Sequence, residues 1–364
     1  MLKVLHYVSR MDRAGQETFI MNLFRVIDRE KIQFNFLCSR RGEGDYDSEI
    51  RALGGQIFYT SEITARGPAK QIQKFRVLKK ALRQHPCDVY HIHTHHAMDA
   101  FRDALAAKSS GIPIVVVHSH NTSALYHIGA HKVFRYLLAL LPIRRFACSE
   151  AAGHWMFLRN NFRVIHNGLN LDDLYFQPES RARVRDEMGW NGQKIIGHVG
   201  RFNEQKNHRF LINVFEKIHK MDQTTRLVLV GQGELESEIR SLVQEKGLED
   251  EVDFLGVRSD VQILYQGMDL LLFPSLFEGL SVVLVEAQAC DLPCLVSDTN
   301  SSETAITNRL TMLSLKEPPE IWAQKALKLL YASKPREDNR EVLRKVGYDI
   351  RTLAVNLEKI YKGQ

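Results

Sequence analysis

The 364-residue chain lacks any apolar run near the length of a membrane-spanning helix. Its longest apolar segments, such as 136–141 and 270–273, fall far below the roughly 20 residues that a bilayer requires. The start, MLKVLHYVSR, holds too short an apolar stretch for a signal peptide and predicts a first strand. We therefore expect a cytoplasmic protein.

Cysteine is scarce, and one common cofactor motif is missing. The five cysteines are odd in number, widely scattered and free of a CxxC pair, which favours reduced core thiols over a disulfide framework. After the first predicted strand the chain reads VSRMDRAGQE, where a dinucleotide-binding enzyme would carry GxGxxG. A Rossmann oxidoreductase thus remains only a remote alternative.

Basic residues exceed acidic ones, giving a net charge of +6 and a pI near 9.0. The excess is local, which argues against a nucleic-acid partner. One helical segment carries Lys70, Lys74, Arg76, Lys79, Lys80 and Arg83, and an apolar YLLALLPI segment is flanked by Arg135, Arg144 and Arg145. We expect these segments to contact acidic membrane headgroups or a lipid diphosphate acceptor on the inner face of the plasma membrane, with a solvated basic surface as the alternative.

Short apolar runs alternate with helical patterns along both halves of the chain, which predicts an α/β protein with parallel sheets flanked by helices. The predicted strands lie within 3–9, 32–39, 54–60, 88–94, 112–119, 144–149, 162–167, 194–200, 226–231, 252–256, 269–275 and 293–297. The length favours two domains, and Gly, Asn, Asp and Pro cluster at 168–178. A last helical pattern covers 341–361.

The segment FPSLFEGLSVVLVEAQA sets two carboxylates, Glu278 and Glu286, eight residues apart. It begins on a short apolar strand and continues past Gly279 into a helix that Ser281 can cap. Free N–H groups at that helix start form an anion site suited to a diphosphate. If the interval is mostly helical, the carboxylates lie roughly 10 Å apart, comparable with the reach of a nucleotide sugar.

Two cations follow another predicted strand, 194–200. Arg201 comes directly after it, and Lys206 opens the next helical pattern. Because the carboxyl ends of neighbouring strands meet at one crevice in α/β sheets, we expect both cations near the carboxylates. They can balance a leaving diphosphate without a metal ion.

Histidines gather near two other strand ends. His91, His93 and His95 alternate along one strand and are joined by His96, a pattern that also suits a metal site. No Cys, Asp or Glu stands at ligand spacing beside them, so we expect them to line a crevice and expect no metal. A separate Asp45-Tyr46-Asp47 triplet spells a metal-binding DxD, but it follows a loop, and we interpret Asp47 as a helix start.

These patterns closely resemble the retaining glycosyltransferases of family 4. The matching segments are the first strand and glycine loop through Gly15 and Glu17, DVYHIHTH (88–95), VHSHN (117–121), ACSEAAG (147–153), VIHNGLN (164–170), GRFNEQKN (200–207), VGQGELE (230–236), FLGVRSDV (254–261) and the Glu278–Glu286 pair. The resemblance implies the GT-B fold, two Rossmann-like domains with parallel sheets facing across a central cleft. It assigns acceptor binding to 1–167, nucleotide-sugar binding to 168–345, and a helix packing back on the first domain to 346–364.

The resemblance also implies roles for single residues. Arg201 and Lys206 would bind the donor diphosphate, Glu278 the transferred sugar and Glu286 the ribose. Further donor contacts would come from Gly15, Gly200, Gly233, Val257 or Arg258, and the Gly279, Leu280 and Ser281 backbone. The first loop reads Arg13-Ala14-Gly15-Gln16, where the family usually has paired glycines, so the phosphate contact at Gly15 is a looser assignment. His118 and His120 end another strand, and alignment favours His120 as the histidine near the sugar.

The implied activity is a retaining sugar transfer from a nucleoside diphosphate sugar to a glycan or lipid-linked acceptor. The VHSHN and CSEAAG spellings resemble enzymes of bacterial exopolysaccharide, capsule or lipopolysaccharide assembly. No residue stands out as a carboxylate nucleophile, so we expect front-face transfer without a cofactor. UDP-glucose, UDP-galactose and UDP-N-acetylglucosamine lead as donors, with GDP sugars as an alternative. The other open alternative is a non-catalytic partner subunit that binds nucleotide sugars.

Overall fold

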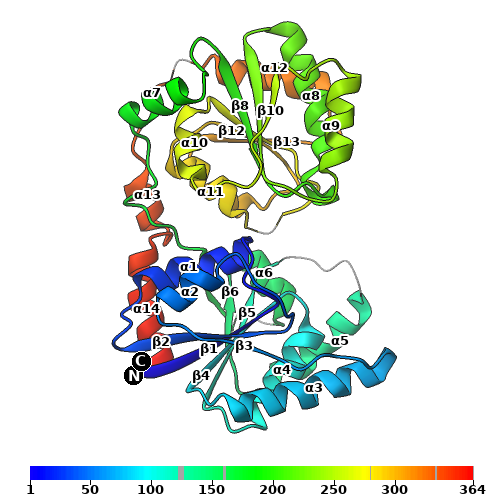
Figure 1. Ribbon diagram of the computed structural model, residues 1–364, viewed down its shortest axis with the longest axis vertical. Helices are drawn as coiled ribbons and strands as arrows, with labels where there is room; N and C mark the ends of the chain where they lie inside the picture. Colours follow the sequence, from blue (N-terminus) through cyan, green and yellow to red (C-terminus); the bar gives the residue numbers. More distant parts are fainter. Residues whose placement is uncertain (122–126, 159–160, 279, 333, 364) are drawn as a thin grey trace. The chain divides into compact units, whose positions relative to one another are not determined.

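The chain forms two compact units (Figure 1). The computed structural model describes residues 1–121, 127–158, 161–278, 280–332 and 334–363. Unit 1 comprises Met1–Asn170 and Gly347–Gln364, and unit 2 comprises Leu171–Val346. The two ends of the sequence therefore belong to the same unit.

Unit 1 is built on a seven-stranded parallel sheet with the order β3-β2-β1-β4-β5-β6-β7. Its strands are β1 (Leu2–Val8), β2 (Ile32–Cys38), β3 (Ile57–Tyr59), β4 (Val89–Thr94), β5 (Ile114–Ser119), β6 (Arg144–Ala147) and β7 (Arg163–Val164). Its helices are α1 (Gly15–Val26), α2 (Asp47–Ala52), α3 (Gly67–Gln84), α4 (Ala97–Lys108), α5 (Ile128–Ala139), α6 (Glu150–Met156) and α14 (Ile350–Lys362). The strand order reverses beside β1, as in doubly wound folds.

Unit 2 has a six-stranded parallel sheet with the order β10-β9-β8-β11-β12-β13. Its strands are β8 (Lys194–Val199), β9 (Thr225–Val230), β10 (Val252–Phe254), β11 (Leu270–Phe273), β12 (Cys294–Ser297) and β13 (Leu310–Leu313). Its helices are α7 (Pro178–Glu187), α8 (His208–Met221), α9 (Glu236–Glu245), α10 (Val261–Gly267), α11 (Val282–Ala289), α12 (Pro319–Leu330) and α13 (Arg340–Lys345), with 3-10 turns η1 (Glu204–Lys206) and η2 (Ser302–Thr304).

Alternation of side chains along the strands places separate cores on the two faces of the unit 1 sheet. On β1, Val4 and Val8 join a core with α1 and α14, whereas Leu5 faces a second core with α3 and α4. The central strands are covered on both faces and are mostly apolar, as parallel strands usually are, but β1, β4 and β5 also carry buried histidines. This arrangement leaves the loops after the strands as the positions for functional side chains.

The predicted fold class is confirmed, with two corrections to its elements. All twelve predicted strands are present, and β13 was missed because its four residues are only partly buried at a sheet edge. The last helical pattern is wrong as a single element, because it divides into α13 and α14. Gly347 lies between them at φ +87°, a backbone conformation that glycine adopts without steric cost.

Candidate functional site

A largely shielded ion pair lies beyond the carboxyl ends of β8 and β11 in unit 2. Lys206 ends the η1 turn after β8, and Glu278 lies in the loop after β11. Lys206 Nζ donates to Glu278 Oε1 at 2.7 Å, and both side chains are largely shielded from solvent. The ammonium also lies 4.5 Å from the centre of the Phe273 ring. The structure thus brings together two residues that the sequence assigned to the donor.

Hydrogen bonds between the η1 turn and the loop after β11 hold this pair in place. The Gln205 side chain donates to the Phe277 carbonyl at 2.9 Å, and Leu276 N donates to the Gln205 carbonyl at 2.8 Å. The Asn207 side chain donates to the Pro274 carbonyl at 3.1 Å. Sequence reasoning missed the roles of Gln205 and Asn207, although both lie inside the GRFNEQKN segment.

Arg201 occupies a different environment from Lys206. Its side chain is 71% exposed and pairs with Glu234 at 3.3 Å. Such an exposed pair contributes little to stability, because water and salt screen it. Arg201 is therefore free to exchange this partner for another anion.

Glu286 lies on α11, where it accepts a hydrogen bond from the Tyr265 hydroxyl of α10 at 3.0 Å. Burial raises the pKa of Glu286 to about 7, and the bond from Tyr265 acts in the opposite direction. A carboxyl group poised near neutrality is typical of ligand and catalytic sites. Tyr265 was missed by the sequence analysis because it lies on a neighbouring helix, 21 residues away.

The helix start beside Glu278 differs in detail from the prediction. Ser281 is the N-cap residue of α11, but its side chain makes no capping hydrogen bond, so that expectation is wrong. Leu280 and Ser281 are buried, and Gly279 lies outside the described residues. The backbone N–H groups at the start of α11 thus have no side-chain cap from Ser281.

Local packing explains two of the glycines assigned to the donor. A Cβ on Gly233 would come within 2.3 Å of the Phe202 carbonyl oxygen, and one on Gly200 would press against the Lys206 side chain at 3.1 Å. Gly200 therefore makes room for the lysine, whereas Gly233 makes room for backbone. In the segment assigned to the base, Val257 is exposed and Arg258 pairs with Asp260 at 2.7 Å.

In unit 1, Gly15 and the two candidate histidines have distinct surroundings. A Cβ on Gly15, the first residue of α1, would meet no atom within 4 Å, so packing does not require glycine there. His118 is wholly buried within β5, whereas His120 follows the strand and is partly exposed. Burial lowers the pKa of His120 to about 3 and that of His118 well below its ordinary value.

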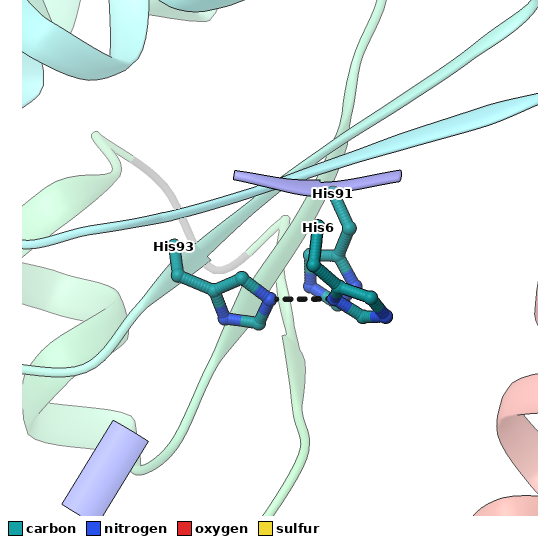
Figure 2. A group of neighbouring side chains, drawn as sticks. All are labelled: His6, His91 and His93. Carbon is teal, nitrogen blue, oxygen red and sulfur yellow. Dashed lines mark hydrogen bonds between the residues drawn. The ribbon is translucent and has the colours of Figure 1, made fainter. Parts of the chain in front are cut away.

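The four histidines proposed as a possible metal set do not converge. His95 is exposed, and His96 caps α4 by accepting from Met98 N at 3.2 Å. His91 and His93 instead lie beside His6 of β1, which sequence analysis missed (Figure 2). In the DxD triplet, Asp47 begins α2 as predicted.

Comparison with known proteins agrees with this geometry. Residues 13–173 match the family model described as Glycosyltransferase Family 4, and residues 180–346 match the one described as Glycosyl transferases group 1. The chain is 36% identical, over 378 aligned positions, to a putative glycosyltransferase EpsF of Bacillus subtilis (strain 168), with 99% of this chain and 96% of the relative covered. The chain belongs to glycosyltransferase family 4.

This family 4 glycosyltransferase has further relatives of similar length. It is 24% identical, over 325 aligned positions, to the UDP-Gal:alpha-D-GlcNAc-diphosphoundecaprenol alpha-1,3-galactosyltransferase of Escherichia coli, with 84% and 82% of the two chains covered. Among solved structures, Anabaena Alr3699/HepE in complex with UDP and glucose has a TM-score of 0.80 at 16% identity, with both chains fully covered. WaaG, a glycosyltransferase involved in lipopolysaccharide biosynthesis, has a TM-score of 0.75 at 18% identity, with 99% and 100% covered. These structures establish the shared GT-B fold.

Proposed function

We propose that this family 4 glycosyltransferase moves a sugar from a UDP-sugar to a glycan or lipid-linked acceptor of cell-surface polysaccharide synthesis, with retention of anomeric configuration. The partly buried Lys206–Glu278 pair carries the proposal. At one sheet edge it places a cation that suits the diphosphate side of the breaking bond and a carboxylate that suits the sugar side. The names of the relatives support the donor and acceptor classes, since one uses UDP-Gal and a diphosphoundecaprenol acceptor.

In the proposed reaction, the bond between the anomeric carbon and the diphosphate oxygen breaks as the acceptor oxygen bonds to the same face. The acceptor proton passes to the departing phosphate. Lys206 stabilises the negative charge that develops on the diphosphate, and exposed Arg201 moves onto the same group. Glu278 accepts hydrogen bonds from sugar hydroxyls, and Glu286 accepts them from the ribose. Because protein cations supply this charge, we expect no need for a divalent metal ion.

The first test combines donor identification with the fate of the anomeric centre. Purified protein is screened against UDP- and GDP-sugars for protection from thermal unfolding, and the product or hydrolysed sugar is followed by NMR in the presence of EDTA. We expect a UDP-sugar to protect and the α-anomer of the donor to yield an α-product. Binding without turnover would favour the partner-subunit alternative, and an inverted product or loss of turnover in EDTA would contradict the proposed mechanism.

Substitution of Lys206 tests the assigned chemistry. Lys206→Ala should lower turnover more than about tenfold, roughly 1.4 kcal/mol of transition-state stabilisation. The matched control is Lys220→Ala, which removes an exposed lysine that pairs with Glu216 on the same segment of chain. Because Lys206→Ala leaves buried Glu278 without its partner, the double variant Lys206→Ala/Glu278→Gln separates stability from catalysis. Recovery of both stability and rate in the double variant would show that Lys206 only neutralises the charge of Glu278 and does not act in catalysis.

We further propose that unit 1 contacts an acidic membrane surface through α5. One face of this helix is apolar and exposed, and Tyr136 and Leu140 are 65% and 79% accessible. That face comprises Val133, Tyr136 and Leu137 of α5 together with its C-cap residue Leu140, which recur at helical spacing. Residues 104–149 contain five Lys or Arg and no Asp or Glu. An apolar face within a cationic segment is typical of helices that lie in the headgroup region of anionic bilayers.

Neighbouring helices supply further positive charge. Helix α4 contacts both α3 and α5, so the three lie side by side in unit 1 (Figure 1). Lys70, Arg76, Lys80 and Arg83 of α3 are exposed. Arg135 and Arg145 are less available, because they donate to backbone carbonyls such as those of His154 and Ala139. The lysines and arginines of α3 are thus the better candidates for headgroup contacts.

A further inference from the structure

Five histidines share one face of the unit 1 sheet. His6 lies on β1, His91 and His93 on β4, and His118 on β5, with His120 directly after β5. The alternation of strand side chains places them on the face that α1 and α14 cover, since Phe19 of α1 contacts His118 and Tyr361 of α14 bonds to His91. Figure 2 shows His6 and His93 pointing toward one another with His91 beside them.

Three of these rings form a hydrogen-bonded file that runs along this face to the carboxyl edge of the sheet. His6 Nδ1 lies 3.0 Å from His93 Nε2, and His93 Nδ1 lies 2.9 Å from His120 Nε2. His93 therefore uses both of its ring nitrogens. His91 stands outside the file, because its Nδ1 bonds to the Tyr361 hydroxyl at 2.7 Å.

The number of protons fixes the tautomers of the three rings together. Burial lowers the pKa of His6 and His120 to about 3 and that of His93 well below its ordinary value, so each ring is neutral at pH 7 and carries one proton. Each bond between two ring nitrogens contains one proton, which accounts for two of the three. The third occupies a free end of the file, either His6 Nε2 or His120 Nδ1. The rings are accordingly all Nδ1-protonated or all Nε2-protonated.

The surroundings of the two ends favour the arrangement in which all three rings are Nδ1-protonated and the third proton is on His120 Nδ1. His6 Nε2 is enclosed without a partner among the described residues, and its ring packs against Phe34 and Phe36. A buried N–H with no acceptor is destabilising, because its hydrogen bond to water is lost and not replaced. His120 Nδ1 is likewise enclosed and has no partner in the described part of the chain, but His120 follows β5 at the carboxyl edge of the sheet, where ligands bind in parallel α/β sheets. A proton there can be satisfied by a bound substrate.

We propose that His93 and His6 are positioning residues that hold His120 as a neutral, Nδ1-protonated hydrogen-bond donor toward an oxygen of the bound sugar or diphosphate. His120 then orients and stabilises the substrate, and it is not a general acid or base. The contact with substrate rests on the proposed function, whereas the file and its tautomers do not.

The tautomers are measured directly by long-range proton–nitrogen NMR of ¹⁵N-histidine protein at pH 7 without substrate. We expect His6, His93 and His120 all to show the Nδ1–H pattern. Nε2–H signals, a charged ring or independent tautomers would overturn the file. Equilibrium dialysis against Zn²⁺ is a second check, because His6, His91 and His93, or His93, His118 and His120, could also gather around one ion. Tight zinc binding to either trio would overturn the proposal, since coordinated nitrogens carry no proton.

The matched substitutions are His93→Phe and His91→Phe, which remove neighbouring buried imidazoles on one strand. Both should lower the unfolding temperature, but only His93→Phe should change the His120 nitrogen signals and lower kcat about tenfold or more. If the two variants change kcat and the His120 nitrogen signals equally, His93 contributes only packing. If the unsubstituted protein shows the expected tautomers but His120→Ala retains full activity, the proposed contact between His120 and the substrate is wrong, whereas the hydrogen-bonded file is correct. Absence of any transfer activity would count against the proposed function, and the spectra would still decide the file.

Discussion

At the scale of single residues, the proposed donor site of unit 2 combines groups from different parts of the sheet edge. Lys206 and Glu278 are paired with one another in the structure, so neither of these two shielded charges lacks a partner. Glu286 has no cationic partner of this kind among the described residues. Burial raises its pKa to about 7, and its carboxyl group accepts a hydrogen bond from the Tyr265 hydroxyl. Donor binding must therefore draw a proton off Glu286 if its carboxylate is to accept two ribose hydroxyls.

This linkage predicts the pH dependence of donor binding. The pKa of Glu286 is raised to about 7, so the carboxyl is mostly protonated below that pH and ionised above it. Because the ribose favours the ionised form, the Kd for UDP-glucose should be constant above about pH 8 and rise as the pH falls below 7, by up to about tenfold per unit. Calorimetry from pH 5.5 to 8.5 measures this, and UDP-glucose is suitable because its diphosphate diester does not titrate in that range.

Two variants test the assignment to Glu286. Glu286→Gln should remove the pH dependence of the Kd and should raise the Kd at high pH, because the carboxylate is lost. Tyr265→Phe removes a bond that lowers the pKa, so the inflection should move to higher pH. If the pH dependence of the Kd is unchanged in Glu286→Gln, another group is responsible for the titration.

The difference between Glu278 and Tyr265 shows what the sequence could predict of this site. Glu278 and Lys206 follow apolar strands, and strand ends in a parallel sheet meet at one edge, so local pattern was enough to group them. Tyr265 contacts Glu286, and His6 contacts His91 and His93, across elements that are separate in the sequence. His6 meets His91 only because β1 pairs with β4, and the order of strands is not encoded in the spacing of residues along the chain.

At the scale of elements, α5 departs from the usual pattern of a surface helix. Such a helix turns its apolar residues to the core and its polar residues to solvent, but α5 buries His131 and Leu138 and exposes Val133 and Tyr136. The sequence showed an apolar segment with flanking cations, but it could not show which of its side chains are covered. That side depends on the packing of α4, which the chain reaches 20 residues earlier.

The proposed membrane contact predicts a difference between two valines of unit 1. Val133 of α5 and Val355 of α14 are 60% and 54% exposed. Val133→Ser should weaken binding to phosphatidylglycerol vesicles about fivefold, because roughly 1 kcal/mol of apolar burial in the bilayer is lost. Val355→Ser should leave binding unchanged. Vesicle flotation at low and high salt, with phosphatidylcholine vesicles as the uncharged control, measures the effect.

Other outcomes of the vesicle experiment would contradict the assignment of α5. Equal binding of both valine variants would place the contact elsewhere on the protein. Concentration-dependent dimers that Val133→Ser abolishes, seen by light scattering without vesicles, would show that a second copy of the chain covers this face.

At the scale of the whole molecule, the C-terminal segment completes the core of the unit in which the chain begins. Leu357 and Tyr361 of α14 are fully buried, and the helix packs on α1. The amphipathic period of this segment predicted a helix, and the resemblance implied where it packs. Unit 1 is therefore assembled from residues far apart in sequence, and its stability depends on a segment that follows unit 2 along the chain.

Truncation after Val346 should consequently unfold unit 1 and spare unit 2. Each large buried side chain of α14 contributes about 1.5–3 kcal/mol, so loss of the helix removes a large share of the roughly 5–15 kcal/mol that stabilises a domain. Limited proteolysis with mass spectrometry should find new cleavage sites in 1–170 and continued protection of 171–346. Leu357→Ala offers a graded version, costing about 2–5 kcal/mol in the unfolding of unit 1, whereas Val355→Ala on the exposed face should cost little. Continued protection of 1–170 in the truncated chain would mean that the core of unit 1 closes without α14. In that case the buried bond between His91 and Tyr361 would be a consequence of folding and not one of its requirements.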